Sequence, residues 1–198
     1  GDLLGGEQSG FISDIGFDMY QRILKEAVQE LKENEFKDLF VEENSKRAFV
    51  EDCVIETDLE LVIPNDYVNE VAERLALYKE LDDLETEEQL LKYQENLIDR
   101  FGEIPKPTLE LIDTIRLRQL AKEIGFEKLF LKKETLIGTF VSKQDSPYYQ
   151  SEKFTKVLQF IQSNPRAAEM KEKNGKLRLI FRGVRTVDQA NDSLKKLL

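Results

Sequence analysis

The residues of this sequence that could perform chemistry include a pair of carboxylates. Asp58 and Glu60 are two residues apart in a β-rich segment, so both would face the same side of a strand. Two neighbouring carboxylates can bind a metal ion or act as an acid–base pair. A solvated strand face accounts for the same spacing, and we favour that interpretation over an enzyme built around Asp58 and Glu60.

The only thiol belongs to Cys53, which follows Glu51 and Asp52. The two negative charges raise the pKa of the thiol, so a reactive thiolate is not expected. A single cysteine forms neither an internal disulfide nor a cysteine-rich zinc site. The sequence has no histidine, which excludes histidine-based catalytic triads and most zinc sites.

The glycine pair Gly5-Gly6 does not have the surroundings of a phosphate-binding loop. No strand is predicted before it, and no Gly-Lys-Ser/Thr sequence follows it. We therefore expect no catalytic residue, no metal site and no bound cofactor in this chain.

Composition and length favour a folded protein of one domain or two small ones. The chain has 198 residues, of which 40% are hydrophobic and 34% charged. It contains no apolar run long enough to span a membrane and no signal-peptide pattern, so we expect a cytoplasmic protein without a membrane partner. It begins with Gly1 rather than Met, which suggests a segment of a longer protein.

Charge is distributed unevenly along the chain. Residues 1–124 have a net charge of −17, from 31 acidic and 14 basic residues, whereas residues 125–198 have a net charge of +7, from 8 acidic and 15 basic residues. Six acids fall within nine positions: Glu80, Asp82, Asp83, Glu85, Glu87 and Glu88. Such a segment would repel nucleic acid and attract a basic protein surface, although a solvated helix junction has the same composition.

Hydrophobic periodicity predicts mainly helices in the acidic part. A capping-box pattern at Thr86-Glu87-Glu88-Gln89 begins one helix, and Gly125 ends another. Leu90, Leu91, Leu97, Ile98 and Phe101 are expected to form the apolar face of the capped helix. The predicted elements are a helix over 16–33, a connector over 34–53, a strand over 54–63, and helices over 67–81, 87–101 and 107–124.

The basic part is predicted to form two β-hairpins and short helices. Strands are expected over 126–132 and 136–141, and helices over 154–161 and from Val187. Asn174-Gly175 is typical of a type I′ turn. A two-residue turn there pairs Glu172 with Leu177, Met170 with Leu179 and Ala168 with Phe181, and sets Lys171 opposite Arg178 on the other face.

These elements indicate an α+β fold, with helices in the acidic first part and two hairpins in the basic last part. We divide the chain into residues 1–33, a connector over 34–53 and a domain over 54–198.

Several blocks of sequence resemble the transcription-repair coupling factor family. The first lies at Gly1–Gly10 with Gly16–Tyr20 and is also similar to RecG-type translocases. Further blocks follow at Leu59–Leu61 with Ile63–Val68, at Arg74-Leu75 with Tyr78-Lys79, at Leu97–Gly102 before Pro105, and at Ile115–Ala121. These blocks are similar to the C-terminal domain of the coupling factors and cover residues 1 to about 130.

The resemblance implies that residues 1–33 are the end of a translocation motif, in which Gln8 matches the motif glutamine. The motor domains that bind ATP and Mg²⁺ in the family are absent, so this chain should neither hydrolyse ATP nor translocate. The following domain would be a regulatory lid that docks on the parent's own UvrB-like N-terminal module and hides the surface for UvrA. RNA polymerase and double-stranded DNA would be partners of the full-length protein only.

The resemblance also suggests which residues would contact the module. Asp99 matches an acidic position of the family, whereas Asn96 replaces an acid, and Glu95 beside it could substitute. Arg100 and Phe101 complete the predicted interdomain interface. For these last two residues, a helix end packed on the domain's own core is an equally good interpretation.

A DNA-binding domain is the alternative function. Lys171, Arg178 and Arg182 would contact phosphates, together with Lys173, Lys176 and Arg185. Clustered cations bind nucleic acid only if they share a face, and no aromatic residues alternate with these for base stacking. A solvated hairpin face is the third interpretation of the same residues.

Overall fold

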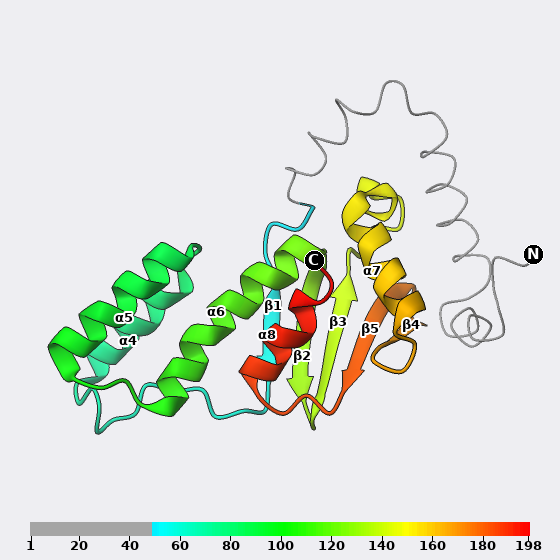
Figure 1. Ribbon diagram of the computed structural model, residues 1–198. Helices are drawn as coiled ribbons and strands as arrows, with labels where there is room; N and C mark the ends of the chain where they lie inside the picture. The colour runs from blue at the N-terminus through cyan, green and yellow to red at the C-terminus, as the bar shows by residue number, and fades with distance from the viewer. Residues whose placement is uncertain (1–48) are drawn as a thin grey trace, which may run out of the picture.

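The computed structural model describes residues 49–198 (Figure 1). The helix predicted over 16–33, Gln8 and most of the connector lie outside these residues. The elements in chain order are β1 Val54–Thr57, α4 Val71–Asp82, α5 Glu87–Phe101, α6 Lys106–Ile124, β2 Phe126–Lys132, β3 Thr135–Phe140, the short 3-10 helix η1 Pro147–Gln150, α7 Glu152–Ser163, β4 Glu169–Lys173, β5 Lys176–Arg182 and α8 Val187–Lys195.

The strands form one five-stranded sheet of order β1-β2-β3-β5-β4. The two predicted hairpins, β2–β3 and β4–β5, make up most of it, and β1 from the acidic part adds a parallel edge strand next to β2. The α+β fold is therefore confirmed. In the second hairpin Met170 pairs with Leu179 and Lys171 with Arg178, as predicted, but β4 begins at Glu169, so Ala168 lies outside the ladder.

Helices α6, α7 and α8 cover one face of this sheet (Figure 1). The core between the layers is rich in aromatic rings: Phe126, Phe140, Tyr148, Tyr149 and Phe154 are all at most 2% exposed. Close packing leaves no room for a side chain on Gly138 of β3, because a Cβ there would lie 2.4 Å from the ring of Phe126.

A second, smaller core lies between α4, α5 and the first half of α6. It is formed by Ile63, Val68, Leu77, Leu81, Leu90, Tyr93, Leu97, Ile104, Ile112 and Ile115. The second half of α6 belongs to the sheet's core through Leu117, Ala121 and Ile124. We call residues 63–115 the helical unit and residues 49–62 with 116–198 the sheet unit; α6 runs through both.

The strand predicted over 54–63 was too long, because β1 ends at Thr57. The Thr57 hydroxyl donates to the Leu131 carbonyl at 2.7 Å and accepts from the Leu59 amide at 3.1 Å, which turns the chain out of the sheet. The next backbone groups bond to helices instead: Thr108 Oγ1 donates to the Val62 carbonyl, and the Ile63 amide donates to the Tyr78 hydroxyl. The alternation of apolar and acidic residues within 54–63 could not reveal these hydrogen-bond partners, which are distant in the sequence.

The last residues of the predicted connector are packed. Val50 and Cys53 are 3% and 2% exposed and belong to the sheet unit's core, and the Phe49 ring lies edge-on to Tyr148 with 5.6 Å between centroids. The charges of Glu51 and Asp52 concealed this, because both point to solvent while their neighbours are buried.

Candidate protein-interaction surface

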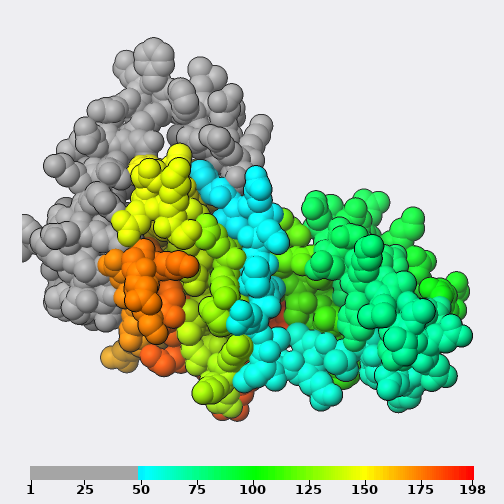
Figure 2. Space-filling model, turned by 180° about the vertical axis from the view of Figure 1, so that it is seen from behind, coloured from blue at the N-terminus to red at the C-terminus, as the bar shows by residue number. Residues whose placement is uncertain are grey.

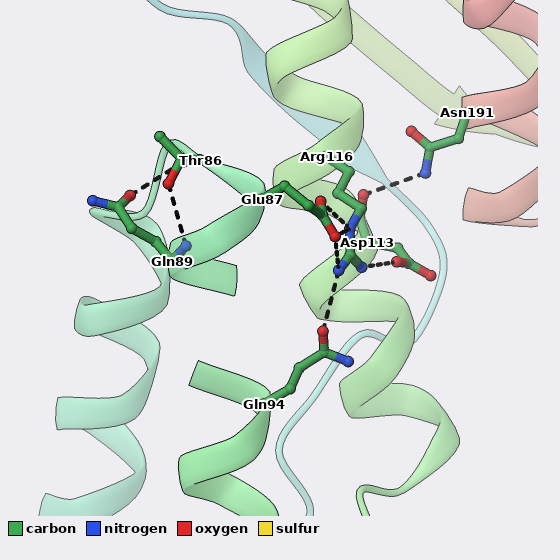
Figure 3. A network of polar contacts seen from close by, with 7 residues as sticks. All are labelled: Thr86, Glu87, Gln89, Gln94, Asp113, Arg116 and Asn191. Carbon is green, nitrogen blue, oxygen red and sulfur yellow. Dashed lines mark hydrogen bonds and ion pairs between the residues drawn. The ribbon is translucent and has the colours of Figure 1, made fainter. Parts of the chain in front are cut away.

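Helix α5 carries the predicted interface residues, and its N-terminus is fixed by the capping box that the sequence indicated (Figure 3). The backbone amide of Gln89 donates to Thr86 Oγ1 at 3.2 Å, and the side-chain oxygen Oε1 of Gln89 accepts from the backbone amide of Thr86 at 3.2 Å. The helix ends at Gly102, whose φ of 87° suits glycine. Both ends are thus defined by local sequence.

The inner face of α5 packs on the helical unit through Leu90, Tyr93 and Leu97, which are at most 3% exposed. The Tyr93 hydroxyl donates to the Leu77 carbonyl of α4 at 2.9 Å. Burial raises the pKa of Tyr93, so this donor keeps its proton. These contacts set which side of α5 faces outward.

The outward face of α5 combines apolar and acidic side chains. Leu91 and Ile98 are 51% and 53% exposed, so these two residues of the expected apolar face do not pack on the core with Leu90 and Leu97. Glu95 lies between them on the helix surface, and Asp99 is one turn beyond Glu95; both are exposed. The sequence contains a partial signal: Leu90–Leu91 and Leu97–Ile98 are adjacent pairs, whose members point about 100° apart around the helix, so a narrow buried stripe holds only one member of each pair.

Arg100 and Phe101 are engaged within the helical unit. Arg100 forms an ion pair with Glu73 of α4, and its guanidinium lies 4.7 Å from the centroid of the Phe101 ring. Phe101 packs edge-on against Tyr67 and against the unit's core. Both residues thus have intradomain contacts, and their part in an interdomain interface stays a prediction.

Two arginines of α6 hold part of the acidic segment. Arg116 pairs with Glu87 through two bonds of 2.8 Å, with Asp113 at 2.5 Å, and with the Gln94 amide oxygen at 3.1 Å (Figure 3). Its hydrogen bonds lower the pKa of the Glu87 carboxyl. Arg118 similarly binds Asp82 at 2.7 Å. The remaining acids of the segment stay exposed, which leaves the surface negative.

The carboxylate pair considered for chemistry is not assembled. Asp58 Oδ2 accepts from the Lys133 amide at 3.0 Å and supports the β2–β3 turn, while Glu60 is exposed beyond the end of β1. Within residues 49–198 no group of three or more potential ligands could hold a metal ion. Burial, followed by the charge of Asp52, raises the pKa of Cys53 to about 12, so its thiol stays protonated.

The three cations of the alternative, nucleic-acid site lie on one face of the sheet. Lys171 of β4 and Arg178 of β5 are paired across the two strands. Arg182 is four residues after Arg178 on β5, so its side chain points to the same side of the sheet. Glu169 pairs with Lys171 at 3.7 Å and with Arg182 at 3.3 Å, which partly neutralises them.

None of the described helices is long and apolar enough to cross a membrane.

Known proteins contain a domain of this kind, in which an acidic helical unit is joined through one long helix to a sheet with helices on one face. Residues 57–151 match the family model of the TRCF domain. The chain also has the fold of a solved structure described as the C-terminal domain of transcription-repair coupling factor, with a TM-score of 0.57 and 16% identity, over 74% of this chain and 94% of that one.

Curated relatives agree with this assignment. The chain is 37% identical over 132 residues to the transcription-repair-coupling factor of Escherichia coli and 28% identical over 181 residues to that of Rickettsia typhi. These alignments cover 65% and 91% of this chain but only 11% and 14% of the relatives' length. The resemblance of this chain to the C-terminal domain of transcription-repair coupling factors is thereby confirmed, and it includes the match of residues 57–151 to the TRCF domain model.

Proposed function

We propose that this chain is the regulatory, autoinhibitory interaction domain of a transcription-repair coupling factor. The parent would be an ATP-dependent DNA translocase that removes RNA polymerase stalled at lesions and recruits nucleotide excision repair. The domain would dock on the parent's UvrB-like module and mask its UvrA-binding surface. Catalysis with ATP and Mg²⁺ would belong to the parent's motor domains.

The observation that carries the proposal is the outward face of α5. Leu91 and Ile98 are exposed apolar side chains on this face, and the exposed carboxylates of Glu88, Glu95 and Asp99 lie beside them, along one side. The whole helical unit holds 14 acidic and 5 basic residues. Apolar contact favours burial of Leu91 and Ile98, and the neighbouring carboxylates select a basic partner and speed association. Such a contact can be held and released, as a lid requires.

Calorimetric titration of the 198-residue chain into the isolated UvrB-like module of the same parent tests this function. We expect binding that weakens as salt rises and that UvrA abolishes by competition. Asp99→Arg should weaken binding about tenfold, because it reverses a charge on the outward face of α5, and Ile98→Ser should weaken it by a similar factor.

Asp192→Arg provides the matched control, since Asp192 is an exposed acid on α8 of the sheet unit. It changes the net charge equally and should leave the affinity unchanged. Binding that persists in both α5 variants, or that UvrA does not displace, would refute docking through α5. Binding lost equally in the control would reduce the contact to net charge alone.

A further inference from the structure

The face of the sheet that α6, α7 and α8 do not cover has an ordered composition. Within residues 49–198 no helix lies over this face, and the strands are directly visible in Figure 2. Paired residues on neighbouring strands share a face, so the register fixes which side chains lie in each row across the sheet.

The central row is apolar. Phe130 on β2, Ile137 on β3 and Ile180 on β5 are direct neighbours outside the two core clusters; Phe130 and Ile137 are half-buried, and Ile180 is 7% exposed. Glu56 on β1 and Glu169 on β4 end the row at its two sides. Neighbouring strands are about 4.8 Å apart, so the three apolar residues span about 10 Å.

Basic residues form a rail on each side of the apolar row. One rail contains Lys128, Arg178 and Lys171, and the other contains Lys132 and Arg182. Each rail lies two residues along the strands, about 6.7 Å, from the row. Five cations against two carboxylates leave the face positive.

The carboxylates at the ends do not satisfy every cation. Glu56 binds Lys128 at 3.0 Å and Lys132 at 3.2 Å, and Glu169 binds Lys171 and Arg182. Arg178 makes no ion pair within residues 49–198, and its Nε is buried without an acceptor. Among the described residues no carboxylate pairs with this guanidinium, so its terminal nitrogens could bind an incoming carboxylate.

We propose that this open face, the basic sheet face, binds an acidic amphipathic helix of a partner protein. Two helical turns are about 11 Å long, which matches the apolar row. Residues that flank an apolar helix stripe project to both sides of it, so glutamates or aspartates there would reach both rails. The composition of the face is thus complementary to such a helix in shape, polarity and charge.

A nucleic acid fits the same face less well. Phe130 is the only aromatic residue in the row, since its neighbours on β3 and β5 are Ile137 and Ile180. Stacking of successive bases requires several accessible rings. Glu56 and Glu169 would in addition repel a phosphate backbone that crossed the strands.

Fluorescence anisotropy with the 198-residue chain distinguishes these ligands. The probe is a labelled synthetic helix of about four turns, with leucines at i, i+3, i+4 and i+7 and glutamates on both flanks. A second peptide has lysine in place of every glutamate, and labelled oligothymidine and a short DNA duplex serve as nucleic-acid probes. We expect binding of the glutamate peptide alone.

The double variant Lys132→Gln with Arg182→Gln removes one rail at exposed positions and should weaken peptide binding about tenfold, the effect of two exposed ion pairs. Ile137→Thr keeps the β-branched shape and should weaken it several-fold. The control Lys195→Gln with Lys196→Gln removes two exposed charges from α8, on the other side of the sheet, and should have no effect.

Three results would overturn the proposal. These are absence of glutamate-peptide binding, equal binding in the rail variant with unchanged circular dichroism, and binding of DNA rather than peptide with the same rail dependence. None of the basic-face variants should alter docking on the UvrB-like module through α5, so failure here and failure of the proposed function are separate outcomes.

Discussion

The helical unit and the sheet unit differ in net charge, in the size of the core and in how many large apolar side chains they expose. The helical unit has a net charge of −9 and exposes Val71, Leu75, Leu91 and Ile98, whereas the sheet unit has a net charge of +4 and buries a cluster of aromatic rings. The boundary of charge along the sequence, near residue 124, is not the boundary of packing. The two cores meet within α6, between Ile115 and Leu117.

This difference suggests that the helical unit supplies a partner-binding surface and that the sheet unit supplies a rigid support. A small core with exposed apolar residues is typical of a surface that gains burial from a partner. A large core under one sheet face supplies a rigid base. Because α6 contributes to both cores, the stability of the two units should be linked but unequal.

The largest expected effect is that of Leu97→Ala. Leu97 is 1% exposed in the helical unit's core, and truncation of a buried leucine costs about 2–5 kcal/mol of unfolding free energy. Native-state hydrogen exchange should show protection lost first in α4 and α5, while β3 and β5 keep theirs. Leu179→Ala in the sheet unit is the matched comparison. Equal loss of protection throughout the chain in both variants would show that the two units unfold as one.

Gly138→Ala should have an intermediate effect, confined to the sheet unit. The added Cβ would meet the ring of Phe126, a buried residue that cannot move freely, and overpacking of this kind costs about 1–3 kcal/mol. Urea unfolding measures the change. Gly102→Ala in the helical unit is the comparison, because a Cβ there meets nothing within 4 Å and only the positive φ opposes it. An unchanged urea midpoint in Gly138→Ala would contradict the close packing of β3.

The smallest expected effect is on the pH dependence of stability, and it comes from the ion pair between Glu87 and Arg116 at the junction of the two units. Arg116 holds the pKa of Glu87 below its ordinary value of 4.5, so Glu87 adds stability above about pH 4.5 that is lost as pH falls through its folded-state pKa. Glu87→Gln should therefore lower the urea midpoint slightly at pH 7 and not at pH 3. A difference between the two proteins that persists or grows at pH 3 would assign the effect to packing instead of charge.

Local signals predicted the ends of several elements correctly. The capping box at Thr86 and the glycines at 102 and 125 end or begin helices as expected, and Asn174-Gly175 forms a turn with positive φ at both residues. In these places the preference of a few neighbouring residues decides the conformation, so a sequence contains the answer.

The β2–β3 turn shows why other features could not be predicted. Lys133 and Glu134 both have positive φ, at 50° and 59°, although neither residue type favours it. The turn is held by distant groups: Asp58 accepts from the Lys133 amide, and the Glu134 carbonyl accepts from the Val184 amide. Contacts across more than forty positions of sequence leave no local pattern.

The candidate surfaces were predictable only in part. The resemblance predicts Glu95 and Asp99 as interface residues, a prediction that stays open, whereas the exposure of Leu91 and Ile98 beside them depends on how α5 packs on α4. On the sheet, Lys171, Arg178 and Arg182 were recognised as a cluster. Their alignment with Lys128 and Lys132 needed the pairing of β2 with β3 and of β3 with β5, which no short-range pattern encodes.

Helix α6 has one consequence for affinity. Its 19 residues form a continuous rod about 28 Å long that joins the unit bearing the α5 face to the unit bearing the basic sheet face. If both proposed surfaces bind, α6 holds them at a fixed separation. A partner with complementary sites at the same spacing would, once bound at the first, meet the second at a high effective concentration, and two weak contacts would then act as one strong attachment.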